Sequence, residues 1–295
     1  MEKLIVIVGP TGVGKTKLSI ELAKRFNGEI INADSTQVYK KMDIATAKVT
    51  EEEKEGIKHY LLDIKNINED YSVCDFQKDA RICIDNILSK NKVPIIVGGT
   101  GLYIKALLYD YKFDINNKKH DYSNLSNEEL YNKLISINPN SKIHKNNRKR
   151  IERTLNIFEN TGKLIEKENK TDKILYASFI IGLTTNRDNL YERINKRVDV
   201  MINNGLVEEA RTIYDTNIRT KAVLTPIGYK ELFDYFDGTK SLEDCIQLIK
   251  LRSRRYAKRQ YTWFNNQMNV KWFDVDYDNF NNTINNVYEY IISNK

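Results

Sequence analysis

The sequence predicts an α/β protein whose core is built on a parallel sheet and is interrupted by a helical insertion. Short apolar strands alternate with amphipathic helices at both ends of the chain, which is typical of parallel βαβ units. The first strand, Leu4–Val8, runs directly into residues 9–16, which match the phosphate-loop pattern G-x-x-x-x-G-K-[ST]. Between residues 110 and 176 helical patterns replace the strand signals. We therefore expect a P-loop NTPase-like core with C-terminal helices (residues 1–109 and 177–295) and a helical insertion domain (residues 110–176).

Composition places the chain among ordinary globular proteins of one or two domains. Of its 295 residues, 41% are hydrophobic and 29% are charged. No stretch is long and apolar enough to span a bilayer, and the first strand is too short for a signal peptide. The three cysteines form no paired metal or disulfide pattern. We expect a cytoplasmic monomer without a membrane partner, and the net charge of +7 suits a polyanionic one.

The predicted phosphate loop has a suitable residue type at each position. Its residues are Gly9, Pro10, Thr11, Gly12, Val13, Gly14, Lys15 and Thr16. Glycines let the backbone wrap an anion, and the following helix adds its positive end. Lys15 supplies a cation, and the Thr16 hydroxyl suits Mg²⁺. The alternative is a glycine-rich turn with a surface lysine, but the flanking strand and amphipathic helix favour a site for a di- or triphosphate.

Asp34 follows the second predicted strand. A helix over residues 17–26 meets a stop signal at residues 27–28, and residues 29–33 form the strand. Because ligands bind beyond the carboxyl ends of parallel strands, we expect Asp34 near the phosphate loop. Its carboxylate can there accept a proton or hold Mg²⁺ through water. Alternatively, Asp34 or Ser35 caps a following helix, for which both are suited, and position alone leaves the two interpretations open.

Glycines close another predicted strand. Residues 40–58 are expected as a polar loop, residues 59–64 as a short strand and residues 72–88 as an amphipathic helix. Val93–Val97 is then a buried strand that ends in Gly-Gly-Thr-Gly at residues 98–101. Such glycines allow the backbone to approach a ligand closely, although a tight turn alone explains them as well.

The insertion carries a helix with many cations at its start. One helix opens at the capping box of Ser126 and Glu129, and a second covers residues 147–160. The first turns of the second helix contain Arg148, Lys149, Arg150 and Arg153. These cations oppose the helix dipole by about 0.3–1 kcal/mol each. A solvated basic face tolerates that cost, whereas an anionic partner turns it into an attraction, and we favour the partner.

Two further basic segments belong to the core. Residues 179–184 are a strand, after which Asn186 caps a helix with Arg193 and Arg197 on one face. Arginine suits bidentate phosphate contact, but this spacing also fits a pair of surface arginines. A last helix opens at Ser241 and interleaves basic and aromatic residues in its second half. That mixture suits nucleic acid, although aromatics at helical spacing are more often core.

Taken in order, these motifs resemble those of the tRNA dimethylallyltransferases, also called tRNA isopentenyltransferases. The matching segments span nearly the whole chain and are residues 9–16, 32–39, 42–48, 97–103, 149–155, 193–197 with 201, 227–232 and 256–263. The resemblance implies transfer of a dimethylallyl group from dimethylallyl diphosphate to N6 of the adenosine immediately 3′ of a tRNA anticodon. It implies assistance by Mg²⁺ and no consumption of ATP.

The resemblance also assigns roles to residues. The catalytic set is Thr11, Asp34 and Arg197, with Asp34 as general base on the adenine amino group and Arg197 as clamp on the diphosphate leaving group. The phosphate loop holds the diphosphate. The set that contacts the anticodon stem-loop is Asp34, Ser35, Thr36, Gln37, Thr100, Lys149, Arg150, Ile151, Glu152 and Arg153. This chemistry is sound, because cations stabilise the departing diphosphate and a positioned carboxylate removes the proton of a poor amine nucleophile.

Three rivals share part of this evidence. An isopentenyltransferase acting on free adenine nucleotide needs the loop and the aspartate but neither basic helix. A small-molecule kinase uses the loop for ATP, and a non-catalytic RNA-binding module does not need Asp34 as a base. The two basic helices favour a tRNA substrate.

Overall fold

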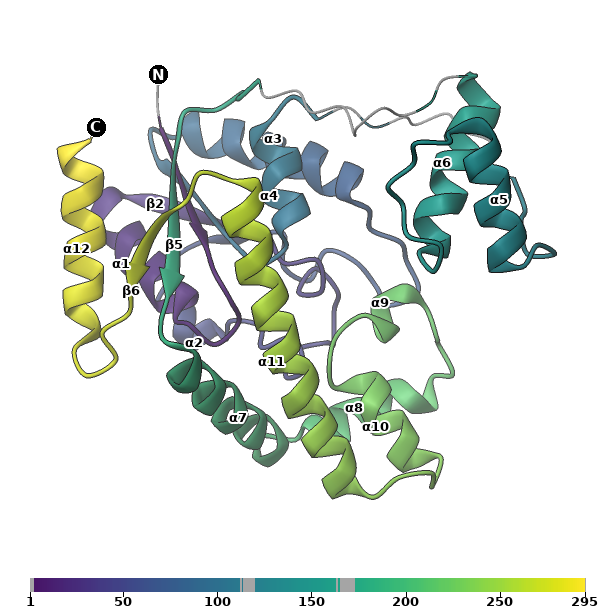
Figure 1. Cartoon of the computed structure of the whole chain (residues 1–295). Coiled ribbons are helices and arrows are strands. Elements are labelled where there is room, and N and C mark those ends of the chain that lie inside the picture. Colours follow the sequence, from purple (N-terminus) through teal and green to yellow (C-terminus); the bar gives the residue numbers. More distant parts are fainter. Residues whose placement is uncertain (1–2, 112, 114–119, 163, 165–172, 295) are drawn as a thin grey trace. The chain divides into compact units, whose positions relative to one another are not determined.

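The computed structural model describes residues 3–111, 113, 120–162, 164 and 173–294. The chain forms two compact units (Figure 1). The first comprises Met1–Tyr109 and Ile174–Lys295, and the second is Asp110–Lys173. The first unit contains the sheet, and the described part of the second is helical.

The described residues of the first unit form a six-stranded sheet in the order β3-β2-β4-β1-β5-β6. Its strands are β1 (Leu4–Val8), β2 (Gly28–Asn32), β3 (His59–Tyr60), β4 (Val93–Val97), β5 (Ser178–Thr184) and β6 (Lys271–Asp274). Every pairing is parallel, which confirms the predicted sheet. Because β1 lies between β4 and β5, the loop that follows it opens at the centre of the sheet.

The described helices are α1 (Lys15–Phe26), α2 (Glu51–Lys54), α3 (Val73–Leu88), α4 (Gly101–Leu108), α5 (Asn127–Ile137), α6 (Arg148–Thr161), α7 (Arg187–Asn203), α8 (Leu206–Asp215), α9 (Lys221–Leu224), α10 (Tyr229–Phe236), α11 (Leu242–Gln267) and α12 (Phe280–Ser293). The helices predicted from the sequence are present as α1, α3, α5, α6, α7 and α11, and the described residues form others as well. The prediction of a loop throughout residues 40–58 is wrong at α2, because Thr50 and Glu53 form a capping box that starts a helical turn. Within the described residues, no helix has the length and apolarity that crossing a bilayer requires.

Side chains that alternate along the strands pack under helices on both faces of the sheet. Ile5 and Ile7 share one buried cluster with Leu22 of α1 and other residues of α1 and α12. Leu4 and Val6 point to the opposite face, into a cluster with residues of α3, α4 and α11. Each fully buried aliphatic side chain contributes about 1.5–3 kcal/mol. The resulting three-layer core fixes the strand ends, and with them the loops that carry the site (Figure 1).

The second unit has a small core of its own. Leu130 and Leu134 of α5 pack against Ile151 and Leu155 of α6, together with Tyr122. The capping box of Ser126 starts α5, and Gly162 ends α6 with a φ of 65°. These contacts orient α6 with one apolar face inward and its basic face outward.

Candidate active site

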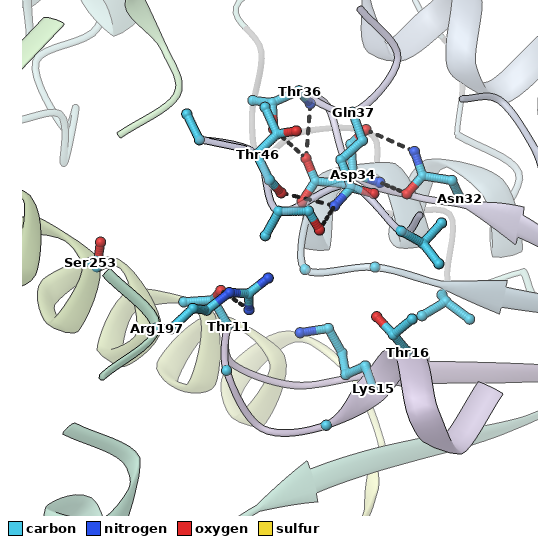
Figure 2. Close-up of a pocket in the computed structure, with 18 of the residues that line it drawn as sticks. Thr11, Lys15, Thr16, Asn32, Asp34, Thr36, Gln37, Thr46, Arg197 and Ser253 are labelled. Carbon is cyan, nitrogen blue, oxygen red and sulfur yellow. Dashed lines mark hydrogen bonds between the residues drawn. The ribbon is translucent and has the colours of Figure 1, made fainter. Parts of the chain in front are cut away.

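A cavity of about 960 Å³ lies at the carboxyl ends of the central strands, within the first unit. The loops that follow β1, β2 and β4 line it, together with side chains of α7 and α11. This is where parallel sheets bind ligands. Figure 2 shows Lys15, Thr11 and Arg197 on one side of the cavity and Asp34 with Thr36 on the other.

The phosphate loop needs its glycines for backbone conformation and for packing. Gly9, Gly12 and Gly14 have φ values of 140°, 81° and 105°, which side-chain-bearing residues rarely adopt. A Cβ on Gly9 would also lie 2.6 Å from the Leu183 carbonyl oxygen. The loop residues that line the cavity are Thr11, Gly12, Gly14, Lys15 and Thr16. Gly9, Pro10 and Val13 are buried and shape the loop without lining the cavity.

Lys15 points back to the backbone of its own loop. Its Nζ donates to the carbonyl oxygens of Gly9 at 3.0 Å and Pro10 at 2.8 Å. Burial, with a smaller effect of the Arg197 charge, lowers the pKa of Lys15 to about 7, although Asp34 acts in the opposite direction. A bound anion would supply the countercharge that the burial of this ammonium demands. The interpretation of Lys15 as a surface lysine is therefore wrong.

Two arginines of α7 reach the phosphate loop. Arg197 Nη1 lies 3.4 Å from Thr11 Oγ1, and Arg193 Nε donates to the Gly12 carbonyl at 3.3 Å. The Arg193 guanidinium also stacks on the Tyr277 ring, 3.9 Å from its centroid. Burial lowers the pKa of Arg197, which nevertheless stays cationic because arginine titrates far above neutrality. Arg197 is thus a half-buried cation on the cavity wall rather than a surface arginine.

Asp34 also faces the cavity, and its carboxylate is held by one neighbour. Its Oδ1 accepts the Thr36 N–H at 2.9 Å and the Thr36 hydroxyl at 2.6 Å. No helix begins at this turn, since the next one in the chain is α2, so the helix-capping interpretation is wrong. The carboxylate instead closes a local turn. Among the described residues, no hydrogen bond engages Asp34 Oδ2, which leaves that oxygen free to accept a proton.

Gln260, which no sequence pattern singled out as a site residue, joins two of the loops. This side chain of α11 is 5% exposed. Its Oε1 accepts the Thr11 N–H at 2.9 Å, and its Nε2 donates to the Gly99 carbonyl at 3.1 Å. A Cβ on Gly99 would lie 2.0 Å from Nε2, and one on Gly98 would lie 2.2 Å from the Ala33 oxygen. Packing against the Ala33 backbone therefore requires Gly98 whether or not a ligand approaches it, and a side chain at position 99 would displace the Gln260 amide from its hydrogen bonds.

Thr100 supports the aspartate loop from β4. Its Oγ1 accepts the Ser35 N–H at 3.2 Å and donates to the Ser35 hydroxyl at 3.4 Å. Burial and the charge of Asp34 raise the pKa of Tyr256, so its hydroxyl remains neutral. Ser35, Thr36 and Gln37 line the cavity, but Thr100 stands behind them. Tyr256 and Gln260 are four residues apart on α11 and therefore lie on one face of the helix, and this spacing is the sequence signal that could have identified both as residues of the site.

The aromatic residues of α11 serve mainly as core. Phe264 is fully buried, and the Trp263 ring packs so closely on Gly101 that a Cβ there would lie 2.1 Å from it. The exposed residues in this half of the helix include Arg255, Lys258 and Arg259. The helix thus combines both interpretations, because Trp263 and Phe264 pack inward whereas Tyr261 is 40% exposed beside the exposed cations.

Thr16 suits a metal that is bound chiefly through substrate. It is exposed in the first turn of α1 and lines the cavity. Among the described residues, no group of three or more His, Cys, Asp or Glu side chains could hold a metal ion. Mg²⁺ keeps several waters and often takes only one or two protein ligands beside phosphate oxygens. A hydroxyl next to a phosphate loop fits that requirement.

The cations of α6 divide into structural and free ones. Arg148 donates to the carbonyls of Tyr122 and Leu125 and pairs with Glu152 at 2.7 Å. The side chain of Ile151 is fully buried. Exposed cations of this helix are Lys149, Arg150 and Arg153, and no ion pair engages them among the residues that the structure describes. The face open to a partner therefore consists of these three, and Ile151 does not belong to it.

Comparison with known proteins gives one consistent result. The family described as IPP transferase matches residues 37–267 of the chain. The tRNA dimethylallyltransferase of Anoxybacillus flavithermus is 50% identical over 98% of this chain and 96% of its own length. The enzyme of the same name from Geobacillus kaustophilus is 50% identical over 93% of this chain and 91% of its own.

Solved structures agree. A tRNA isopentenylpyrophosphate transferase from Staphylococcus epidermidis is 42% identical, covers 100% of both chains and superposes with a TM-score of 0.77. One from Bacillus halodurans is 44% identical, covers 99% of this chain and 96% of its own, and has the same TM-score of 0.77. A eukaryotic dimethylallyltransferase acting on tRNA is 32% identical over 93% of this chain and 74% of its own, with a TM-score of 0.83.

Proposed function

The chain belongs to the tRNA dimethylallyltransferase family, and we propose that its cavity transfers a dimethylallyl group from dimethylallyl diphosphate to N6 of the adenosine 3′ of the tRNA anticodon. One observation carries this proposal above the others. The phosphate loop, Arg197 of α7 and the carboxylate of Asp34 line a single cavity from three separate parts of the chain (Figure 2). This prenyl transfer requires positively charged side chains that bind the diphosphate and, opposite them, a carboxylate that acts as the base.

The loop side of the cavity binds and activates the donor. Lys15 and Arg197 neutralise the diphosphate, while the Thr11 hydroxyl lies within reach of the same group. As the allylic C–O bond breaks, negative charge accumulates on the leaving diphosphate. Fixed cations in a partly dehydrated site stabilise that charge and lower the barrier. Mg²⁺, with Thr16 as its protein ligand, would add charge neutralisation at the diphosphate when bound.

The opposite side of the cavity prepares the acceptor. An exocyclic adenine amine is a weak nucleophile, so its proton must leave as the new C–N bond forms. The two hydrogen bonds from Thr36 hold Asp34 Oδ1, and Oδ2 is then the oxygen that takes the proton. The adenosine has to leave its stack to enter such a cavity. The polar residues Ser35 and Gln37, which line the cavity beside Asp34, would contact the extruded nucleotide.

The free cations of α6 are proposed to bind the tRNA backbone. Lys149, Arg150 and Arg153 are exposed, and electrostatic contact with phosphates supplies much of the affinity of such complexes. Glu152 would act through Arg148, which it helps to hold. Thr100 would act through Ser35, whose amide it binds.

Transfer of a labelled prenyl group tests the function directly. The protein is incubated with labelled dimethylallyl diphosphate, Mg²⁺ and either unmodified tRNA or AMP, and the nucleosides are separated and analysed by mass. We expect label on an adenosine of the tRNA and none on AMP. Label on AMP alone would support a transferase for free nucleotide. Turnover of ATP without prenyl transfer would support a kinase.

A further inference from the structure

The carboxylate of Glu209, on α8, receives four hydrogen bonds from groups distant in sequence. Its Oε2 accepts the N–H groups of Asp43 and Ile44, each at 2.9 Å. Its Oε1 accepts the Ala45 N–H at 3.1 Å and the Tyr229 hydroxyl at 2.7 Å. Successive N–H groups that converge on one anion form a nest, and here the anion is a side chain of the protein itself.

The segment that Glu209 holds is part of the cavity wall. The cavity is lined by Ala45, the last of the three residues whose amides Glu209 accepts, and by the next two residues, Thr46 and Ala47. Ala47 has a φ of 50°, a conformation that a residue other than glycine keeps only when its surroundings impose it. Two backbone hydrogen bonds within the turn, from Ala47 to Ile44 and from Lys48 to Asp43, close it locally, and the bonds from Glu209 attach it to α8.

A second set of bonds connects this wall to the loop of Asp34. Gln37 Nε2 donates to the carbonyl oxygens of Thr46 at 3.0 Å and Ala47 at 3.2 Å. Figure 2 shows Thr46 and Gln37 beside Asp34, on the side of the cavity away from Lys15. Glu209 thus binds the amides of residues 43–45, and Gln37 binds the carbonyls of residues 46–47.

We propose that Glu209 is a positioning residue for the acceptor side of the cavity. It holds residues 43–47 in the one arrangement that supports Gln37 and leaves room beside Asp34 for the extruded adenosine. This inference rests on the proposed function and deepens it. Glu209 is a positioning residue because it does not line the cavity and acts only through residues 43–47. Its effect should fall on tRNA use and spare donor binding, which depends on the phosphate loop and α7.

The test compares Glu209→Ala, Glu209→Gln and the control Glu208→Ala. Glu208 is the adjacent, exposed carboxylate of α8, so its removal changes the same charge without touching the wall. Amide hydrogen exchange over residues 42–48 measures whether Glu209 holds this segment in place. Steady-state kinetics with tRNA and with dimethylallyl diphosphate, varied separately, report its consequence.

For Glu209→Ala we expect loss of exchange protection and a fall of about 10- to 100-fold in kcat/KM for tRNA, with the KM for the donor unchanged. Glu209→Gln should recover part of both, since an amide oxygen still accepts hydrogen bonds, and Glu208→Ala should match the wild type. Retained exchange protection in Glu209→Ala, or a rise in the KM for the donor as large as the loss in kcat/KM for tRNA, would overturn the inference. A wild-type protein that prenylates no tRNA would instead refute the proposed function, and the exchange measurement would still decide whether Glu209 holds the segment.

Discussion

Gln260 Oε1 lies 2.9 Å from the backbone nitrogen of Thr11, although 249 residues separate the two in sequence. The same side chain donates to Gly99, so one amide connects α11 with the loops after β1 and β4. Prenyl transfer requires the diphosphate donor and the adenosine to be positioned relative to each other with a precision of less than about 1 Å. We infer that α11 fixes the spacing of the loops that hold them.

Replacing Gln260 with leucine should damage both stability and catalysis. The Thr11 N–H and the Gly99 carbonyl would lose their partner in a buried position, at a cost of about 1–3 kcal/mol per group in the free energy of unfolding. The transfer rate should fall as well, because the phosphate loop loses its support. Urea denaturation and transfer kinetics measure the two effects. Gln247→Leu, at an exposed position of the same helix, is the control. Wild-type values for Gln260→Leu would show that the bridge is dispensable.

Donor binding should weaken as the pH rises through about 7, the value to which burial and Arg197 lower the pKa of Lys15. Below that value the free protein carries an ammonium, and above it the amine is increasingly neutral. A bound diphosphate favours the charged form and raises the pKa, so binding takes up a proton. The dissociation constant should therefore increase with pH by up to about tenfold per unit, until it reaches the pKa of the complex.

Calorimetric titration with diphosphate at several pH values measures this dependence. Lys15→Arg is the matched variant, because a guanidinium keeps its charge over the whole range. Its titration retains only the pH dependence of the ligand. Equal slopes for the wild type and Lys15→Arg would mean that Lys15 does not titrate in the free protein.

Arg150→Ala should weaken tRNA binding without changing donor use. Arg150 is exposed on α6, and each lost phosphate contact should reduce the slope of log K against log salt by about 0.7–0.9. Filter binding at a series of salt concentrations gives that slope, and kinetics give the donor KM. A change confined to the donor KM would mean that the basic face of the second unit has been misassigned.

Local patterns made much of the core predictable. The glycines of the phosphate loop adopt positive φ values and lie between β1 and α1, as the motif demands. Ser72 and Ser126 form capping boxes that start α3 and α5, and the signal needs only residues within four positions. The strands β1, β2, β4 and β5 likewise follow from short apolar runs, whereas β3 covers only His59–Tyr60 of the strand expected over residues 59–64.

Other elements depend on contacts that a sequence pattern does not show. The helix α4 is buried on nearly all sides, so its apolar residues lack a helical period and the segment was not predicted as helix. The strand β6 pairs with β5 only after an excursion of many residues. Gln260 looks like one more polar residue of a basic helix, and its role arises because α11 runs past the ends of the strands. Glu209 was not predicted either, because its partners at residues 43–45 lie more than 160 positions away in the sequence.

The proposed reaction depends above all on Asp34 as the base opposite the phosphate loop. Asp34→Asn is the sharpest test, because the amide oxygen can still accept both hydrogen bonds from Thr36 and so preserve the turn. Single-turnover transfer of a labelled dimethylallyl group to tRNA, with both substrates saturating, isolates the chemical step. We predict a rate lower by about 10²–10⁴ with unchanged donor affinity. Transfer at the wild-type rate would show that Asp34 is not the base.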